Sequence, residues 1–163
     1  MQKQDYNKEN IRTFVNEQIS GKIKTLEFYL NFTLDATREI KKTSKYDSIR
    51  EEMQEEIYHL DKQMHSLKSM QKQMQRVLNS TSTNVQLGSL VITNKARFYI
   101  SVSLGEFFFE NTRFYAISTE SPMYKIMAGK SVGDSFVLNK IHQEIMALRQ
   151  KVWKRIILQD GIR

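Results

Sequence analysis

A few residues of this sequence have types and spacings that could support chemistry. Glu56 and His59 reproduce the E-x-x-H spacing with which helices present a carboxylate and an imidazole to a di-iron centre. Such a centre also needs a second copy of the motif and two carboxylates from facing helices, and the preceding segment supplies no second copy. We therefore interpret this pair as part of a solvent-exposed helix face.

The other candidates for catalysis fail similar tests. The acidic cluster at residues 51–56 lies beside basic residues at helical spacing, which is typical of a charged helix face. His65 and His142 have no nucleophile or acid at recognisable spacing, and GKSVGD (129–134) does not match a phosphate-binding loop. The chain has no cysteine, which excludes thiol catalysis and cysteine-based zinc sites. We predict that the protein is not an enzyme, with no catalytic residue, metal site or cofactor.

A lysine-rich segment, REIKKTSKY (38–46), has a different character. It interrupts the hydrophobic pattern without glycine or proline, and three of its residues are lysines. Ammonium groups can contact the phosphates of RNA or a nucleotide, so we expect an indirect nucleic-acid contact here. The candidate residues of this tip segment are Glu39, Lys41, Lys42, Lys45, Tyr46 and Asp47.

Two long helices are expected to position the tip segment. On each side of it, apolar residues recur at seven-residue intervals, as the a and d positions of a coiled coil do. The first rows are Ile19, Leu26 and Ile40, with Thr33 in the gap, beside Ile23 and Leu30. The second are Tyr46, Met53, Leu60, Leu67 and Met74, beside Ile57, Met64 and Leu78, which Gln71 interrupts. They predict two helices of roughly 30–35 residues, each about 50 Å long.

The short break at residues 41–45 favours an antiparallel coiled-coil hairpin over residues 1–80. The alternative is one continuous helix that dimerises. We expect a monomer.

The second half of the chain follows a different period. After the polar linker NSTSTN (79–84), residues 84–148 alternate as β-strands do. Five strands are predicted, at 85–93, 97–103, 113–118, 135–139 and 141–148. A short helix at 121–129 has Ser121 as its cap, Pro122 in its first position and Gly129 at its end. The expected fold class is α+β, with one helix against an antiparallel sheet.

Charge and hydropathy bear on partners and location. The net charge of +7 divides into +2 for residues 1–84 and +5 for residues 85–163. Much of the excess lies in a basic amphipathic tail, 149–163, which either packs on the domain or docks on a partner, nucleic acid or membrane surface. No stretch approaches the roughly 20 apolar residues of a membrane span, and no signal peptide is apparent. We predict a cytoplasmic protein without a membrane partner.

Three segments of the second half resemble a known family. GS (88–89) opens a strand, ISTESP (117–122) precedes the short helix, and GKSVGD (129–134) follows it. In this order and spacing, residues 85–148 resemble the C-terminal domain of the bacterial Gre transcript-cleavage factors. KYDSIREEMQEEI (45–57) resembles the start of the second Gre helix. The tail after Leu148 lies outside the resemblance.

The resemblance implies a partner and a binding mode. Gre factors dock an FKBP-like C-terminal domain at the rim of the RNA polymerase secondary channel and project a coiled coil towards the active centre. By this resemblance, the small domain here is FKBP-like and the partner is RNA polymerase. The family's docking loop falls on Ser118, Glu120, Ser121 and Pro122.

The tip segment departs from the family's pattern. Cleavage-stimulating Gre factors carry an Asp and a Glu three residues apart, which help to hold a second Mg²⁺. Magnesium prefers such oxygen ligands. Aligned on Tyr46, these positions fall near Glu39 and Lys42, so the second has the opposite charge. We therefore expect a transcription elongation regulator that does not stimulate cleavage.

Two other functions stay open at the level of the sequence. An FKBP-like domain could act as a prolyl isomerase, although only fold analogy supports this. A coiled coil could also serve as a structural adapter.

Overall fold

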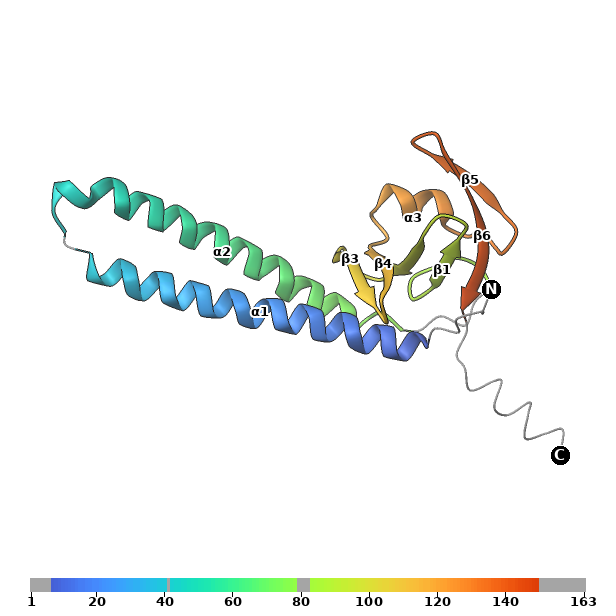
Figure 1. Cartoon of the computed structure of the whole chain (residues 1–163), viewed down its shortest axis with the longest axis horizontal. Coiled ribbons are helices and arrows are strands. Elements are labelled where there is room, and N and C mark those ends of the chain that lie inside the picture. The colour runs from blue at the N-terminus through green and yellow to red at the C-terminus, as the bar shows by residue number, and fades with distance from the viewer. Residues whose placement is uncertain (1–6, 41, 79–82, 150–163) are drawn as a thin grey trace, which may run out of the picture. The chain divides into compact units, whose positions relative to one another are not determined.

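Two long helices precede a six-stranded mixed sheet in the computed structural model, which describes residues 7–40, 42–78 and 83–149 (Figure 1). The predicted α+β class is confirmed. The chain divides into two compact units. We call Asn16–Lys72 the hairpin unit, and Met1–Val15 with Gln73–Arg163 the sheet unit. The first two turns of the first helix therefore group with the sheet, whereas the sequence suggested a division near residues 80–84.

The helices are α1 (Lys8–Glu39) and α2 (Asp47–Met74), separated by a 3-10 turn, η1 (Ser44–Tyr46). Asn7 Oδ1 accepts a hydrogen bond from Glu9 N at 2.9 Å and so caps the start of α1. Because α1 ends at Glu39, the single continuous helix is wrong.

The helices of the hairpin unit run antiparallel. Thr37 Oγ1 contacts Met53 Sδ at 3.7 Å, and Gln71 Nε2 donates to Ser20 Oγ at 3.4 Å, so later residues of α1 meet earlier residues of α2. Five residues of the predicted rows are buried: Ile19, Ile23, Leu60, Met64 and Met74. Leu78, predicted in the same seam, lies beyond the end of α2 and is 73% exposed.

The sheet has the strand order β3-β4-β2-β1-β6-β5. Its members are β1 (Leu90–Thr93), β2 (Arg97–Ile100), β3 (Gly105–Phe109), β4 (Thr112–Ile117), β5 (Ser135–Leu138) and β6 (Ile141–Arg149). Helix α3 (Pro122–Met127) follows β4. Every neighbouring pair is antiparallel except β2–β4, which is parallel.

Two sheet predictions were wrong. The sequence predicted five strands in an antiparallel sheet, and it missed β3. The β3–β4 hairpin turns at Glu110 (φ 50°) and Asn111 (φ 61°), a pair of positive φ angles usually signalled by glycine. Because β3 pairs with β4 as an edge hairpin, β4 runs parallel to β2, and this pairing makes the sheet mixed.

The first predicted strand begins later than expected. Residues 86–89 form a turn in which Ser89 N donates to Gln86 O at 3.0 Å. Val85 instead pairs with the end of the α3 segment, since its N donates to Lys130 O at 2.8 Å. This hydrogen bond joins Val85, the first residue after the polar linker, to the loop that follows α3.

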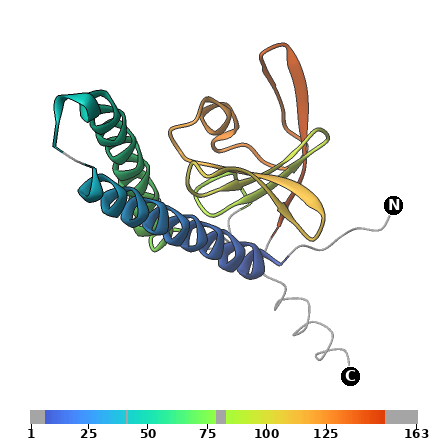
Figure 2. The same cartoon turned by 60° about the vertical axis from the view of Figure 1, so that its left-hand side comes forward.

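Each face of the sheet is covered within the sheet unit. On one face, α3 contributes Met127 to a core with Val91, Phe98, Phe136 and Ile145. On the other, Phe14 of α1 packs on the rings of Phe107 and Phe109, with centroids 5.9 and 5.4 Å away. Figure 2 shows the beginning of α1 beside the β3–β4 hairpin. This second layer explains why residues 8–15 group with the sheet.

Candidate functional site

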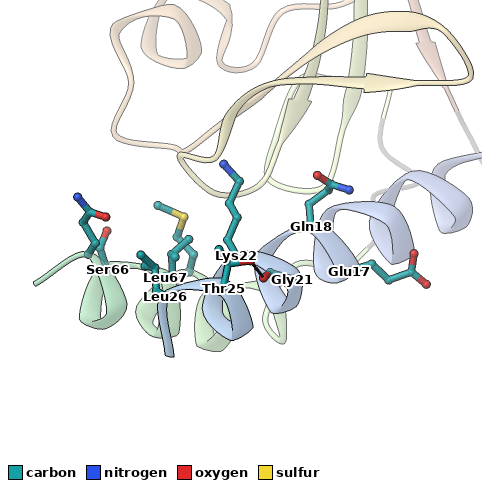
Figure 3. Close-up of a pocket in the computed structure, with 10 residues that line it drawn as sticks. Glu17, Gln18, Gly21, Lys22, Thr25, Leu26, Ser66 and Leu67 are labelled. Atoms are coloured by element: carbon teal, nitrogen blue, oxygen red, sulfur yellow. Dashed lines mark hydrogen bonds between the residues drawn. The ribbon is translucent and has the colours of Figure 1, made fainter. Parts of the chain in front are cut away.

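A groove of about 670 Å³ runs between the two helices that carry the tip segment (Figure 3). It surrounds Gly21, whose carbonyl oxygen accepts a hydrogen bond from Thr25 Oγ1 at 3.0 Å. A Cβ added at Gly21 would meet no atom within 4 Å. The groove is therefore open beside Gly21, and we assign it no chemical role.

Three aromatic side chains of α1 are exposed to solvent. Phe28, Tyr29 and Phe32 are 68%, 53% and 65% exposed, and the rings of Phe28 and Tyr29 meet edge to face at 6.0 Å. Exposed apolar clusters commonly mark interaction surfaces. The sequence analysis did not predict this exposed cluster. Bulky aromatic residues outside the predicted heptad rows of a helix indicate such a surface.

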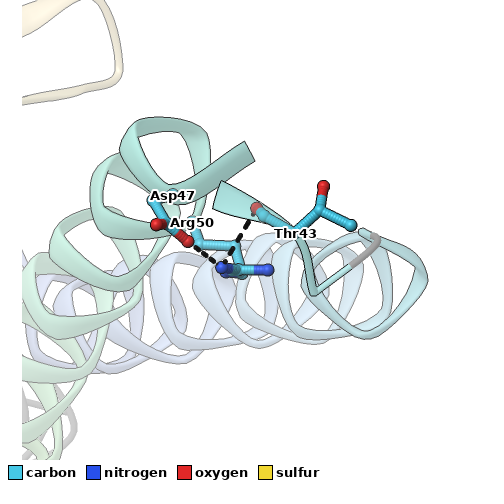
Figure 4. Close-up of polar contacts among 3 residues, drawn as sticks. All are labelled: Thr43, Asp47 and Arg50. Atoms are coloured by element: carbon cyan, nitrogen blue, oxygen red, sulfur yellow. Dashed lines mark hydrogen bonds and ion pairs between the residues drawn. The ribbon is translucent and has the colours of Figure 1, made fainter. Parts of the chain in front are cut away.

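The tip segment is held by its own backbone and by one ion pair (Figure 4). Thr43 is extended, and its carbonyl oxygen accepts from Tyr46 N at 3.0 Å to form the 3-10 turn. Arg50 pairs with the carboxylate of Asp47 and also reaches Thr43 O at 3.5 Å. Polar contacts thus replace the glycine or proline that a turn between helices often uses.

Charges at the tip segment divide unequally. Asp47 is neutralised by Arg50, and the carboxylate of Glu39 has no ion pair among the described residues. Lys42 and Lys45 are exposed, and Lys45 Nζ lies 5.8 Å from the ring centroid of Tyr46. The predicted tip residues therefore present a cationic surface with one available carboxylate, that of Glu39. Lys41 lies outside the described residues.

The predicted docking loop connects β4 to α3. Ser121 caps α3, since its side chain accepts from Tyr124 N at 3.1 Å, and Pro122 occupies the first turn. Ser118 Oγ accepts from Glu120 N at 3.2 Å, and Ser121 N donates to Ser118 O at 3.1 Å. These bonds fix the loop backbone and leave the Glu120 side chain exposed.

A cleft of about 450 Å³ adjoins this loop within the sheet unit. Ser118 and Glu120 line it, whereas Ser121 and Pro122 do not. Its other lining residues are Gln73, Arg76, Val77, Leu87, Ser101, Ser103 and Thr119. The cleft is rich in hydroxyl and amide groups, so it suits hydrogen bonding to a polar partner segment.

The motifs set aside as non-catalytic form ordinary surface contacts. His59 packs edge to face against Tyr58 at 5.7 Å, and His65 Nδ1 bonds to Asp61 O at 2.9 Å. Within residues 7–40, 42–78 and 83–149, no three His, Cys, Asp or Glu side chains gather where they could hold a metal ion. Apart from Arg149 at the end of β6, the predicted basic tail lies outside the described residues.

No protein-family model matches this chain, and no curated protein matches it. No helix of the described ranges combines the length and the apolarity needed to cross a membrane.

Proposed function

We propose that this protein binds RNA polymerase and regulates transcript elongation without stimulating transcript cleavage. In this proposal the sheet unit is an FKBP-like docking domain, and α1 and α2 form a coiled coil that enters the secondary channel. The observation that carries the proposal is the charge of the tip segment. Asp47 is engaged by Arg50, and the segment that contains Glu39 carries two exposed lysines, Lys42 and Lys45, instead of a second carboxylate.

The local geometry of the family-like motifs supports the resemblance. The ISTESP segment (117–122) forms the end of β4 and the cap of α3. In GKSVGD (129–134), Gly129 and Gly133 have φ angles of 77° and 93°, and Asp134 Oδ2 accepts from Ser131 N at 2.8 Å. The motif residues therefore occupy positions that need their particular types.

The tip segment bears on the mechanism through electrostatics. Two carboxylates are needed to share a divalent cation with the polymerase, and an ammonium group near the second position would repel it. Lysines suit a different contact, with the phosphates of RNA or a nucleotide. The exposed aromatics Phe28 and Phe32 would add apolar contacts along the channel wall.

Binding to core RNA polymerase tests the docking step. We expect wild-type protein to bind, and Glu120→Lys to weaken binding about tenfold or more, because the exposed carboxylate changes sign at the proposed contact. Pro122→Ala is a milder change at the first turn of α3. Glu110→Lys is the matched control, since it reverses an exposed acid on the β3–β4 turn. Absence of binding by the wild-type chain would refute the proposal.

Tip variants test the second step. Replacing Lys41, Lys42 and Lys45 by alanine should leave docking within about threefold and change the elongation rate. The control replaces three exposed lysines elsewhere on the helices, Lys24, Lys62 and Lys68.

A gain of activity gives the sharpest readout. The pair Glu39→Asp with Lys42→Glu restores the acidic pattern, so it should confer Mg²⁺-dependent cleavage of backtracked transcripts that the wild type lacks. Cleavage by the wild type would contradict the mechanism.

A further inference from the structure

The cleft of about 450 Å³ beside the predicted docking loop lies at the carboxyl ends of β2 and β4, the parallel pair of the sheet. We call it the strand-end cleft. Ser101 directly follows β2, Ser118 directly follows β4, and Ser101 N donates to Ile117 O at 2.8 Å. At the carboxyl ends of parallel strands the following loops leave the sheet in different directions, and ligands of open α/β sheets bind in the space between them. The volume lies within the range of about 300–1,000 Å³ that is typical of small-ligand sites.

Four hydroxyl groups line the strand-end cleft, those of Ser101, Ser103, Ser118 and Thr119. Ser101 is 5% exposed and its Oγ donates to Tyr99 O at 3.3 Å, so this oxygen can still accept a bond. Ser118 Oγ accepts from Glu120 N, so its proton can still be donated. The hydroxyls of Ser103 and Thr119 form no hydrogen bond with the rest of the described chain. The cleft therefore offers both donors and acceptors, as the N–H and C=O groups of a peptide require.

Two side chains of opposite charge line the same cleft. Arg76 lies in the turn after α2, Glu120 lies in the loop before α3, and both are exposed. Among the described residues, neither side chain forms an ion pair. Because the two do not neutralise each other, each charge is available to a ligand. All the residues that line the cleft belong to the sheet unit.

This combination of groups discriminates between classes of ligand. A nucleotide or another phosphate-rich ligand would meet a single cation and would be repelled by the carboxylate of Glu120. An apolar ligand would remove water from the hydroxyl groups without replacing their hydrogen bonds. A zwitterion satisfies both charges, and a peptide backbone between its charged ends also satisfies the hydroxyls.

We propose that the strand-end cleft binds a short zwitterionic peptide, with the carboxylate of the peptide at Arg76 and its ammonium group at Glu120. The guanidinium of Arg76 offers the fork of donors that a carboxylate accepts, and the carboxylate of Glu120 accepts charge-assisted bonds from an ammonium group. The hydroxyls of the two strand ends bond to the peptide groups between these charges. This binding requires no polymerase, so it goes beyond the proposed function.

NMR titration of the full chain tests the proposal with diglycine, triglycine and tetraglycine, whose charged ends differ in separation. At least one of these peptides should bind saturably and shift the amide signals of residues 118–120. For that peptide, N-terminal acetylation removes the ammonium charge and C-terminal amidation removes the carboxylate charge. Each change should weaken binding about tenfold or more, as the loss of a charge-assisted bond implies. The titrations contain no polymerase, so their outcome is independent of the proposed docking.

Two charge-neutralising variants assign the ends of the peptide. Arg76→Gln should weaken binding of the free peptide about tenfold and leave binding of its amide within about twofold, because the amide has no carboxylate to lose. Glu120→Gln should likewise weaken the free peptide and leave its acetylated form unchanged. The matched controls, Arg113→Gln and Glu110→Gln on the β3–β4 hairpin, lie outside the cleft and should bind as the wild type does. If the wild type binds none of the three peptides, or if either cleft variant leaves binding of the free peptide unchanged, the proposal is overturned.

Discussion

The buried phenol of Tyr99 should make the stability of the sheet unit fall at high pH. Burial raises the pKa of Tyr99 from 10.0 to about 12. The charge of Arg12 lowers this pKa by a smaller amount, and the charge of Glu9 raises it further. Desolvation disfavours the phenolate, so the folded protein retains a proton that the unfolded chain releases.

The sign and size follow from linkage. Below pH 10 both states hold the proton, and the full contribution is present. Between pH 10 and 12 the unfolded chain loses the proton first, so the free energy of unfolding decreases as pH rises. Each unit of pKa difference is worth about 1.4 kcal/mol, so the total loss is about 3 kcal/mol for the two units and is complete only above pH 12.

Urea denaturation between pH 8 and pH 12 measures this loss, with Tyr99→Phe as the test variant. Other groups also titrate in this range, so the quantity of interest is the difference between the two proteins. At pH 12, where the folded protein has also begun to release this proton, wild type should have lost about 2 kcal/mol more than Tyr99→Phe. Tyr29→Phe removes an exposed phenol and controls for the loss of one tyrosine. Equal losses in wild type and Tyr99→Phe would refute the reasoning.

Three substitutions probe the packing and hydrogen bonds of the sheet unit by chemical denaturation. Ser121→Ala removes the cap that accepts from Tyr124 N, and should cost about 1 kcal/mol; an unchanged midpoint would contradict the capping role. Thr93→Val leaves Gln143, which is 5% exposed, without the 2.7 Å bond from Thr93 Oγ1, and should cost about 1–3 kcal/mol. Ile11→Ala opens a cavity at a side chain with 0% exposure and should cost about 2–5 kcal/mol, whereas a cost below 1 kcal/mol would argue against its burial.

Local signals in the sequence were sufficient to predict the two long helices and α3. The seven-residue rows required a buried helix face, and the structure buries Leu60 and Met64 on it. Ser121 and Pro122 together specify the start of a helix almost independently of the rest of the chain, and α3 begins there. Such predictions succeed because capping and helical periodicity depend on residues only a few positions apart.

The strand pairing of the sheet was harder to predict, because it joins segments that are distant in the sequence. Glu110 and Asn111 adopt positive φ angles without glycine, so the β3–β4 turn carried a weak signal. The parallel pairing of β2 with β4 follows from where β3 lies in the strand order, and no periodicity within either strand encodes that position.

The tip segment and the surroundings of Tyr99 differ in the same respect. The lysines of the tip segment are neighbours in sequence, so their charge was evident before any fold was known. Arg12 belongs to the start of α1 and lies near Tyr99 of β2 only because α1 covers this face of the sheet, which no local pattern of the sequence encodes.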